Sequence, residues 1–110
     1  MDNVNNVATG QIVLNGFELE AAEKAIVENL VKNYKHKMSE KGKFEYVQLR
    51  TRKSQKGKTF MHEVEGKMKA NGKLFNSKST DYNLFAATDA VLDKLLNELI
   101  HTQRTSRQRK

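Results

Sequence analysis

The chain has 110 residues, and its 20 Lys and Arg against 13 Asp and Glu give a net charge of +7, with a pI near 9.7. A length of this order predicts one domain, because domains commonly contain ~100–150 residues. The absence of cysteine excludes disulfide bonds and thiolate metal sites. A small basic domain is attracted to phosphate backbones or to anionic membrane surfaces.

The hydropathy pattern argues against membrane insertion and secretion. The sequence contains no run of about 18 apolar residues, the length that a membrane-spanning helix needs. Residues 1–10 lack the basic start and apolar core of a secretion signal. Because segment 1–9 is polar and has no periodicity, we expect it to be flexible. The expected location is cytoplasmic, without membrane contact.

The first element in chain order is a short strand at 11–14. Ile12 and Leu14 fall on one face and Val13 on the other, and Asn15-Gly16 marks a turn at its end.

A helix is predicted next, from about Glu18 to about Met38. Acidic residues crowd its beginning and lysines its end, which complements the helix dipole. Lys32 and Lys35 lie one turn apart, away from the apolar stripe. That stripe consists of Leu19, Ile26, Val27, Leu30, Val31 and Tyr34.

Three strands then follow one another. The first, 44–51, alternates Phe44, Tyr46 and Gln48 with Val47 and Leu49. The basic segment 52–58 is interpreted as a hairpin loop. The second strand, 59–68, has Phe60, His62, Val64 and Met68 on one face and Met61, Glu63, Glu65 and Lys67 on the other. The turn Ala70-Asn71-Gly72 leads into a third strand at 73–78.

A second helix is predicted within Asp81–Gln103, with Asn83 as its N-cap. Lys94, Asn97 and His101 occupy the side opposite its apolar stripe. The stripe consists of Leu84, Thr88, Val91, Leu92, Leu95, Leu96 and Leu99. The basic tail 104–110 is expected to be flexible.

The predicted element order is β-α-β-β-β-α. Strands joined by short turns form an antiparallel meander, and the first strand can join it in parallel after the helical crossover. We therefore predict an α+β two-layer sandwich, with a four-stranded sheet and two helices on one face. The single domain covers 10–103, between the flexible segment 1–9 and the tail 104–110.

Residues typical of catalysis or metal binding are missing. The three histidines (His36, His62 and His101) fall on three different elements, and none has a partner at metal-ligand spacing. The sequence has neither a nucleophile elbow nor a glycine-rich phosphate loop. We expect no enzyme activity, no metal or other cofactor and no small-molecule substrate.

Binding to RNA phosphates is the function that the charge pattern favours. Both helices, the predicted hairpin loop and the tail carry cations that can face one surface. If the helices lie side by side, Lys32, Lys35 and Lys94 are expected to form one outward positive ridge. The candidate RNA-binding residues are Lys32, Lys35, Arg52, Lys53, Lys56, Lys58, Lys94, His101, Arg104 and Arg107.

A family resemblance adds to this reading. Asn71-Gly72, followed by Phe85-Ala86-Ala87 and Asp93-Lys94-Leu95, resembles the last strand and helix of the ribosome hibernation promoting factors and ribosome-associated translation inhibitors. The resemblance covers about Gln11 to Gln103 and implies the fold predicted above.

The resemblance also implies a function. Members of that family bind the small ribosomal subunit and its rRNA across the decoding channel, through basic residues on both helices. Lys32, Lys35 and Lys94 match such positions. Asn97 and His101 stand where further lysines are expected. We expect a translation inhibitor of idle ribosomes that is monomeric when free.

Other functions remain open. A double-stranded RNA-binding domain shares the α-β-β-β-α order, but its lysine cluster at the start of the last helix is replaced here by Asn83-Leu84-Phe85-Ala86-Ala87. A protein-interaction adaptor, or another RNA-binding domain, is the remaining alternative.

Overall fold

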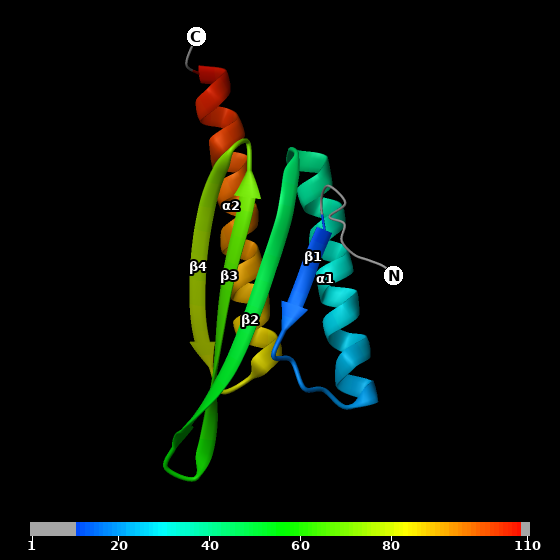
Figure 1. Ribbon diagram of the computed structural model, residues 1–110, viewed down its shortest axis with the longest axis vertical. Helices are drawn as coiled ribbons and strands as arrows, with labels where there is room; N and C mark the ends of the chain where they lie inside the picture. The colour runs from blue at the N-terminus through cyan, green and yellow to red at the C-terminus, as the bar shows by residue number, and fades with distance from the viewer. Residues whose placement is uncertain (1–10, 109–110) are drawn as a thin grey trace.

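The computed structural model describes residues 11–108, with side chains through Thr102, so the segment 1–9 predicted to be flexible lies outside the described residues. The elements are β1 (Gln11–Asn15), α1 (Ala21–Lys41), β2 (Phe44–Lys56), β3 (Thr59–Ala70), β4 (Lys73–Asp81) and α2 (Leu84–Gln108) (Figure 1).

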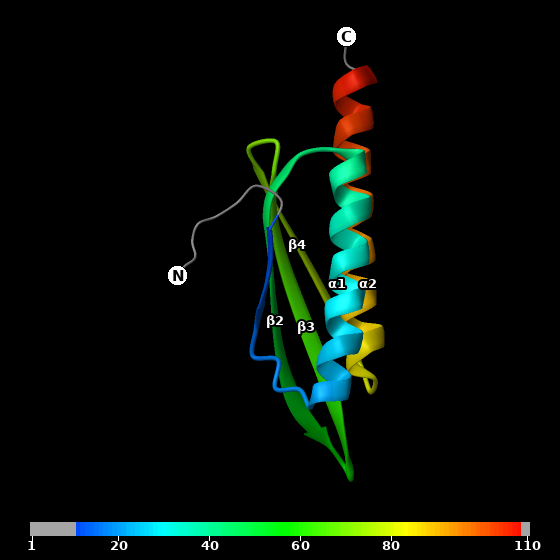
Figure 2. The same ribbon diagram turned by 90° about the vertical axis from the view of Figure 1, so that its right-hand side faces the viewer.

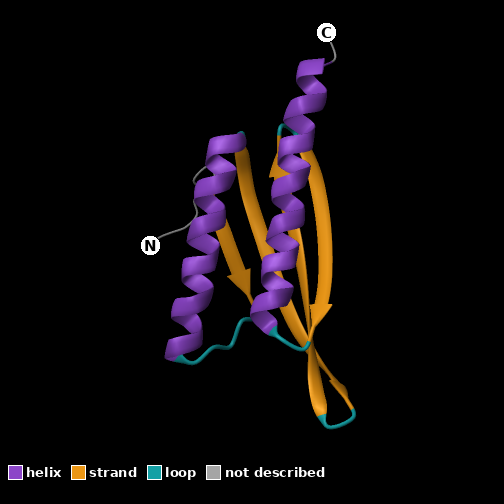
Figure 3. Cartoon of the chain, turned by 180° about the vertical axis from the view of Figure 1, so that it is seen from behind, coloured by secondary structure: helices purple, strands orange, loops and turns teal. Residues whose placement is uncertain are grey.

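The strands form one sheet in the order β1-β2-β3-β4. β1 pairs with β2 in parallel, and the other two pairs are antiparallel. Both helices lie on the same face of the sheet, which gives two layers (Figure 2), and they run side by side (Figure 3). The predicted α+β two-layer sandwich with β-α-β-β-β-α order is therefore confirmed.

The predicted Asn-Gly turn joins β3 to β4. Asn71 has a φ of 55° and Gly72 a φ of 76°. Two successive positive φ values match the twist of a two-residue hairpin, and asparagine and glycine tolerate them best.

α2 packs over β3 and β4. Asn83 is its N-cap, as predicted, because Asn83 Oδ1 accepts bonds from the N–H groups of Phe85 (2.8 Å) and Ala86 (3.1 Å). Gly66 explains how closely the helix packs. A Cβ on Gly66 would lie 2.7 Å from Val91 and 3.0 Å from Leu95. This strand glycine therefore makes room for the helix.

α1 packs on one side against α2 and β1. It starts at Ala21 rather than Glu18, and the Glu20 N–H donates to Glu23 Oε1 (3.1 Å) in a capping arrangement at its start. Its fully covered residues are Val27, Tyr34 and Met38. The prediction that Ile26 belongs to the buried stripe was wrong, since its side chain is 49% exposed.

The face of the sheet to which Phe44 points was also predicted incorrectly. The pairing of β2 with β3 shifts between Phe44 and Tyr46, which places an irregularity at the start of the strand. Phe44 is consequently 1% exposed and belongs to the core with Val47 and Leu49. A strict alternation would have put it on the other face with Tyr46 and Gln48.

Two further boundaries differ from the prediction by several residues. Segment 52–58 is not a loop, because β2 continues to Lys56 and the turn is confined to Gly57 and Lys58. β2 and β3 therefore form a long hairpin that extends beyond the rest of the sheet (Figure 1). α2 continues past the predicted end at Gln103, to Gln108.

Candidate RNA-binding surfaces

The first group of predicted site residues lies on the outer flank of α1. Lys32 and Lys35 are exposed and line an open groove of about 370 Å³ beside β1, together with Ile12 and Leu14. Glu28 lines the same groove. The two lysines thus stand over the β1 edge of the molecule, where an anionic partner can reach both of them.

The seam between the helices has a different character. Tyr34 Oη on α1 donates to Asp89 Oδ1 on α2 at 2.8 Å, and Lys37 Nζ lies 5.0 Å from the centre of the Tyr34 ring. Burial raises the pKa of Tyr34 well above its usual range, and the hydrogen bond to Asp89 and the charges of Asp89 and Asp93 raise it further. The phenol therefore remains a proton donor, and the α2 side of the seam is acidic.

Lys94 lies on the far flank of α2. It follows Asp89 by five residues, so it is rotated about 140° around the helix from the side that meets α1. Lys94 and His101 are both exposed. The structure therefore separates Lys94 from Lys32 and Lys35 by the seam, which carries Asp89 and Asp93 on α2 and Lys37 on α1, and the expected single ridge does not form.

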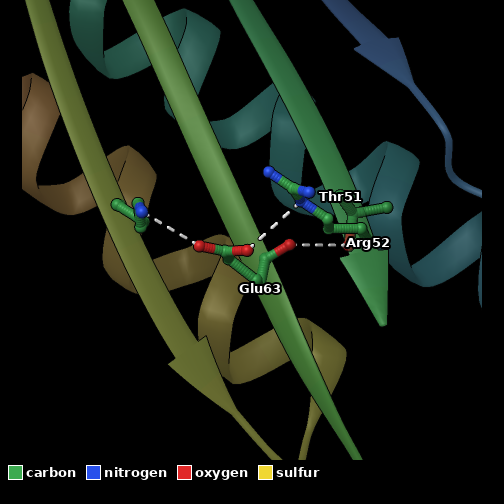
Figure 4. Close-up of polar contacts among 4 residues, drawn as sticks. Thr51, Arg52 and Glu63 are labelled. Atoms are coloured by element: carbon green, nitrogen blue, oxygen red, sulfur yellow. Dashed lines mark hydrogen bonds and ion pairs between the residues drawn. The ribbon is translucent and has the colours of Figure 1, made fainter. Parts of the chain in front are cut away.

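The hairpin cations are divided between the two faces of the sheet. Because β2 continues through them, neighbouring residues point in opposite directions. Arg52 faces the side without helices, where Arg52 Nε lies 3.3 Å from Glu63 Oε1 (Figure 4). Lys53 faces the other side, and its Nζ lies 5.4 Å from the centre of the Phe60 ring. Lys56 and Lys58 are exposed near the tip.

Glu63 binds several neighbours at the base of the hairpin. Its Oε2 lies 3.1 Å from Lys78 Nζ, and its backbone oxygen accepts a bond from Thr51 Oγ1 at 3.1 Å (Figure 4). The hydrogen bond from Lys78 lowers the pKa of Glu63, and the charges of Lys78 and Arg52 lower it further. Arg52 is therefore partly neutralised, which makes it a weaker candidate than Lys53, Lys56 or Lys58.

The face of the sheet without helices carries cations that the sequence analysis did not select. They are Arg50, Lys67, Lys69 and Lys78. Acidic residues stand among them: Glu65 is in register with both Arg50 and Lys78, and Lys69 Nζ lies 3.9 Å from Glu45 Oε1. Their alternation along the strands was visible in the sequence, but their grouping depends on the register.

Arg104 and Arg107 lie on the last turns of α2, which extend beyond the sheet (Figure 1). No helix in the described part of the chain is long and apolar enough to cross a membrane. Within residues 11–108, no three histidine or acidic side chains come together in a way that could hold a metal ion.

Solved structures share this arrangement. A ribosomal subunit interface protein from Coxiella burnetii superposes with a TM-score of 0.60 at 13% sequence identity, over 86% of this chain and 98% of that one. The Protein Y N-terminal domain of Thermus thermophilus superposes with a TM-score of 0.51 at 20% identity, over 84% of this chain and 94% of that one. The chain has the fold of these proteins.

Comparison with protein-family models and with curated protein sequences gives no match. At these identities, the similarity of the structures establishes the fold. It is the fold implied by the resemblance noted in the sequence.

Proposed function

We propose that this protein binds the ribosome and inhibits translation by occupying the decoding channel of the small subunit. The observation that carries the proposal is the fold, shared over nearly the full length of two solved structures, one of which is named a ribosomal subunit interface protein. The sequence resemblance to hibernation factors supports the same function independently. A cytoplasmic location follows from such a partner.

The charge distribution supports rRNA as the partner. The chain has a net charge of +7, and its exposed cations include the α1 flank (Lys32 and Lys35), the hairpin tip (Lys56 and Lys58) and Lys94. Cations on separate elements can contact several phosphates at once and fix the orientation of the protein on RNA. Lys32 and Lys35 on α1 face away from Lys94 on α2, which suits a channel with RNA on two sides.

Sedimentation with purified ribosomal subunits tests the proposal. We expect the protein to pellet with the small subunit and to inhibit translation in a purified system. The logarithm of the binding constant should fall linearly with the logarithm of salt concentration, by roughly 0.7–0.9 per phosphate contact. A protein that pellets with neither subunit contradicts the proposal. Binding that does not respond to salt would favour the adaptor alternative.

A further inference from the structure

Two exposed aromatic side chains meet where the hairpin leaves the sheet. Phe60 is 51% exposed and Tyr82 is 61% exposed. Together with Thr59 and His62 they line an open depression of about 590 Å³, which we call the aromatic hollow. Within residues 11–102, Phe60 and Tyr82 are the aromatic side chains that are more than half exposed.

The strand register explains why these side chains gather and why they are uncovered. Phe60 and His62 are two residues apart on β3, so their side chains point to the same face of the sheet. Further along the sheet, the helices cover this face. β4 ends at Asp81, in register with His62, so Tyr82 follows directly beside them. The hairpin extends beyond the region that α1 and α2 cover (Figures 1 and 2). The rings are therefore not covered by a helix.

Three lysines of the hairpin lie near the aromatic hollow, outside its lining. Lys53 is in register with His62, and its Nζ lies over the Phe60 ring at 5.4 Å from the centre. Lys58 directly precedes Thr59, and Lys56 pairs with Thr59 across the hairpin turn. Exposed aromatic rings combined with nearby cations are the features by which proteins hold single-stranded nucleic acid, because bases stack on the rings and phosphates meet the cations.

Carboxylates also lie nearby, and two of them already bind backbone groups. Asp81 Oδ1 accepts the Asn83 N–H at 2.8 Å, and Glu23 Oε1 accepts the Glu20 N–H at 3.1 Å. Glu18 and Glu23 line an adjoining depression of about 570 Å³, which shares His62 and Tyr82 with the aromatic hollow and also contains Lys53. The lining of the aromatic hollow itself contains no acidic residue.

We propose that the aromatic hollow stacks an unpaired base of single-stranded RNA, while Lys53 and Lys58 hold the adjacent phosphates. The inference rests on RNA being the partner, as in the proposed function, and adds a contact to a base at a place remote from the helix flanks. The lysine over Phe60 and the lysines near the hairpin tip favour RNA over an apolar segment of a protein partner, which would leave these charges unused.

The test compares a labelled single-stranded RNA oligonucleotide with a version of the same length in which the bases are removed. Fluorescence anisotropy gives the affinity of both for the full chain. We expect the base-bearing RNA to bind at least about fivefold more tightly, as the stacking of one base in the hollow predicts. Phe60→Leu and Tyr82→Leu should each remove most of this difference, since leucine keeps an apolar surface but has no ring face.

Leu74→Ala is the matched control, because Leu74 is 63% exposed and lies on β4, away from the aromatic hollow. We expect it to bind both oligonucleotides as the unaltered protein does. Thermal unfolding of all three variants should be nearly unchanged, because the substituted side chains are exposed. Equal affinity of the unaltered protein for the two oligonucleotides would overturn the inference. Phe60→Leu and Tyr82→Leu binding both RNAs unchanged would also overturn it, and would leave the rings as a surface for a protein partner.

Sedimentation with the small subunit separates this inference from the proposed function. If the protein pellets with the subunit but does not discriminate between the oligonucleotides, the inference fails and the proposed function stands. If it discriminates through Phe60 and Tyr82 but does not pellet, the inference stands and the proposed function fails.

Discussion

The two helices lie on the same face of the sheet, yet they differ in how deeply they are buried. In α1, only Val27, Tyr34 and Met38 are buried. The buried residues of α2 run along the whole contact with the sheet and comprise Ala87, Thr88, Val91, Leu92, Leu95, Leu96 and Leu99. α2 therefore contributes most of the helix packing in the core, whereas α1 presents most of its surface to solvent.

This difference separates the parts of the molecule that are constrained by packing from those that are free to bind. A residue on α2 that faces the sheet has close neighbours on several sides, so its size and shape matter. An exposed residue of α1, such as Lys32 or Lys35, can change without disturbing the core. The cations of α1 can therefore serve recognition at little cost to stability.

The largest expected effect is in the core under α2. Leu95 is 0% exposed, so Leu95→Ala should lower the free energy of unfolding by ~2–5 kcal/mol through lost burial and the cavity that remains. Ile26→Ala on α1 should change it by at most ~0.5 kcal/mol, because Ile26 is half exposed. Urea unfolding measures both. Similar losses for the two variants would mean that α1 is packed more fully than described.

A second test adds volume instead of removing it. Gly66→Ala should lower the free energy of unfolding by ~1–3 kcal/mol, because the new Cβ would meet Val91 and Leu95 on α2 and Leu49 on β2. Ser39→Ala, on the exposed surface of α1, is the control and should be nearly neutral. A neutral Gly66→Ala would contradict the close approach of α2 to the sheet.

The seam between the helices should give a smaller effect. Tyr34→Phe removes the hydrogen bond to Asp89, and we expect a loss of ~0.5–1.5 kcal/mol in the free energy of unfolding. Tyr46→Phe, on the face of the sheet without helices, provides the control. If both substitutions cost the same, the bond to Asp89 contributes nothing specific to the docking of α1.

The raised pKa of Tyr34 predicts that the stability of the protein depends on pH in the alkaline range. The pKa of Tyr34 is raised in the folded protein, so its contribution to stability is complete below the ordinary tyrosine pKa of ~10 and is lost as pH rises above that value. Tyr34→Phe should remove this part of the alkaline decline. Thermal unfolding between neutral pH and pH ~11 follows it, and an unchanged decline in Tyr34→Phe would contradict the assignment.

The sequence was sufficient for the fold because α2 and the Asn71-Gly72 turn carry strong local signals. It was insufficient where the local structure depends on contacts with residues that are distant in the sequence. The pairing shift beside Phe44 breaks the alternation, and 52–56 is polar yet becomes strand because each residue of β2 there pairs with one of β3. Polar residues on both faces of a hairpin that extends beyond the sheet look like a loop in the sequence.

The exposure of the candidate residues was predicted in part. The helical spacing placed Lys32 and Lys35 away from the apolar stripe, and both are exposed. Spacing alone does not show which side of each helix faces the other helix. The separation of Lys94 from these lysines therefore became visible only in the packing of α1 against α2. Likewise, Phe60 was placed on the correct face of its strand, but its exposure depends on where the helices end.

The most direct test of the account is ribosome binding by a variant of the α1 flank. Lys32→Glu combined with Lys35→Glu should fold normally, because both residues are exposed, and should lose binding to the small subunit. If each lysine meets a phosphate, the slope of log K against log salt should also fall by about two. Lys67→Glu combined with Lys73→Glu makes the same change in net charge on exposed strand positions. It should retain most of the binding, because acidic residues stand among the cations of that sheet face. Equal losses in the two pairs would mean that only the overall charge matters and would contradict a specific surface on α1.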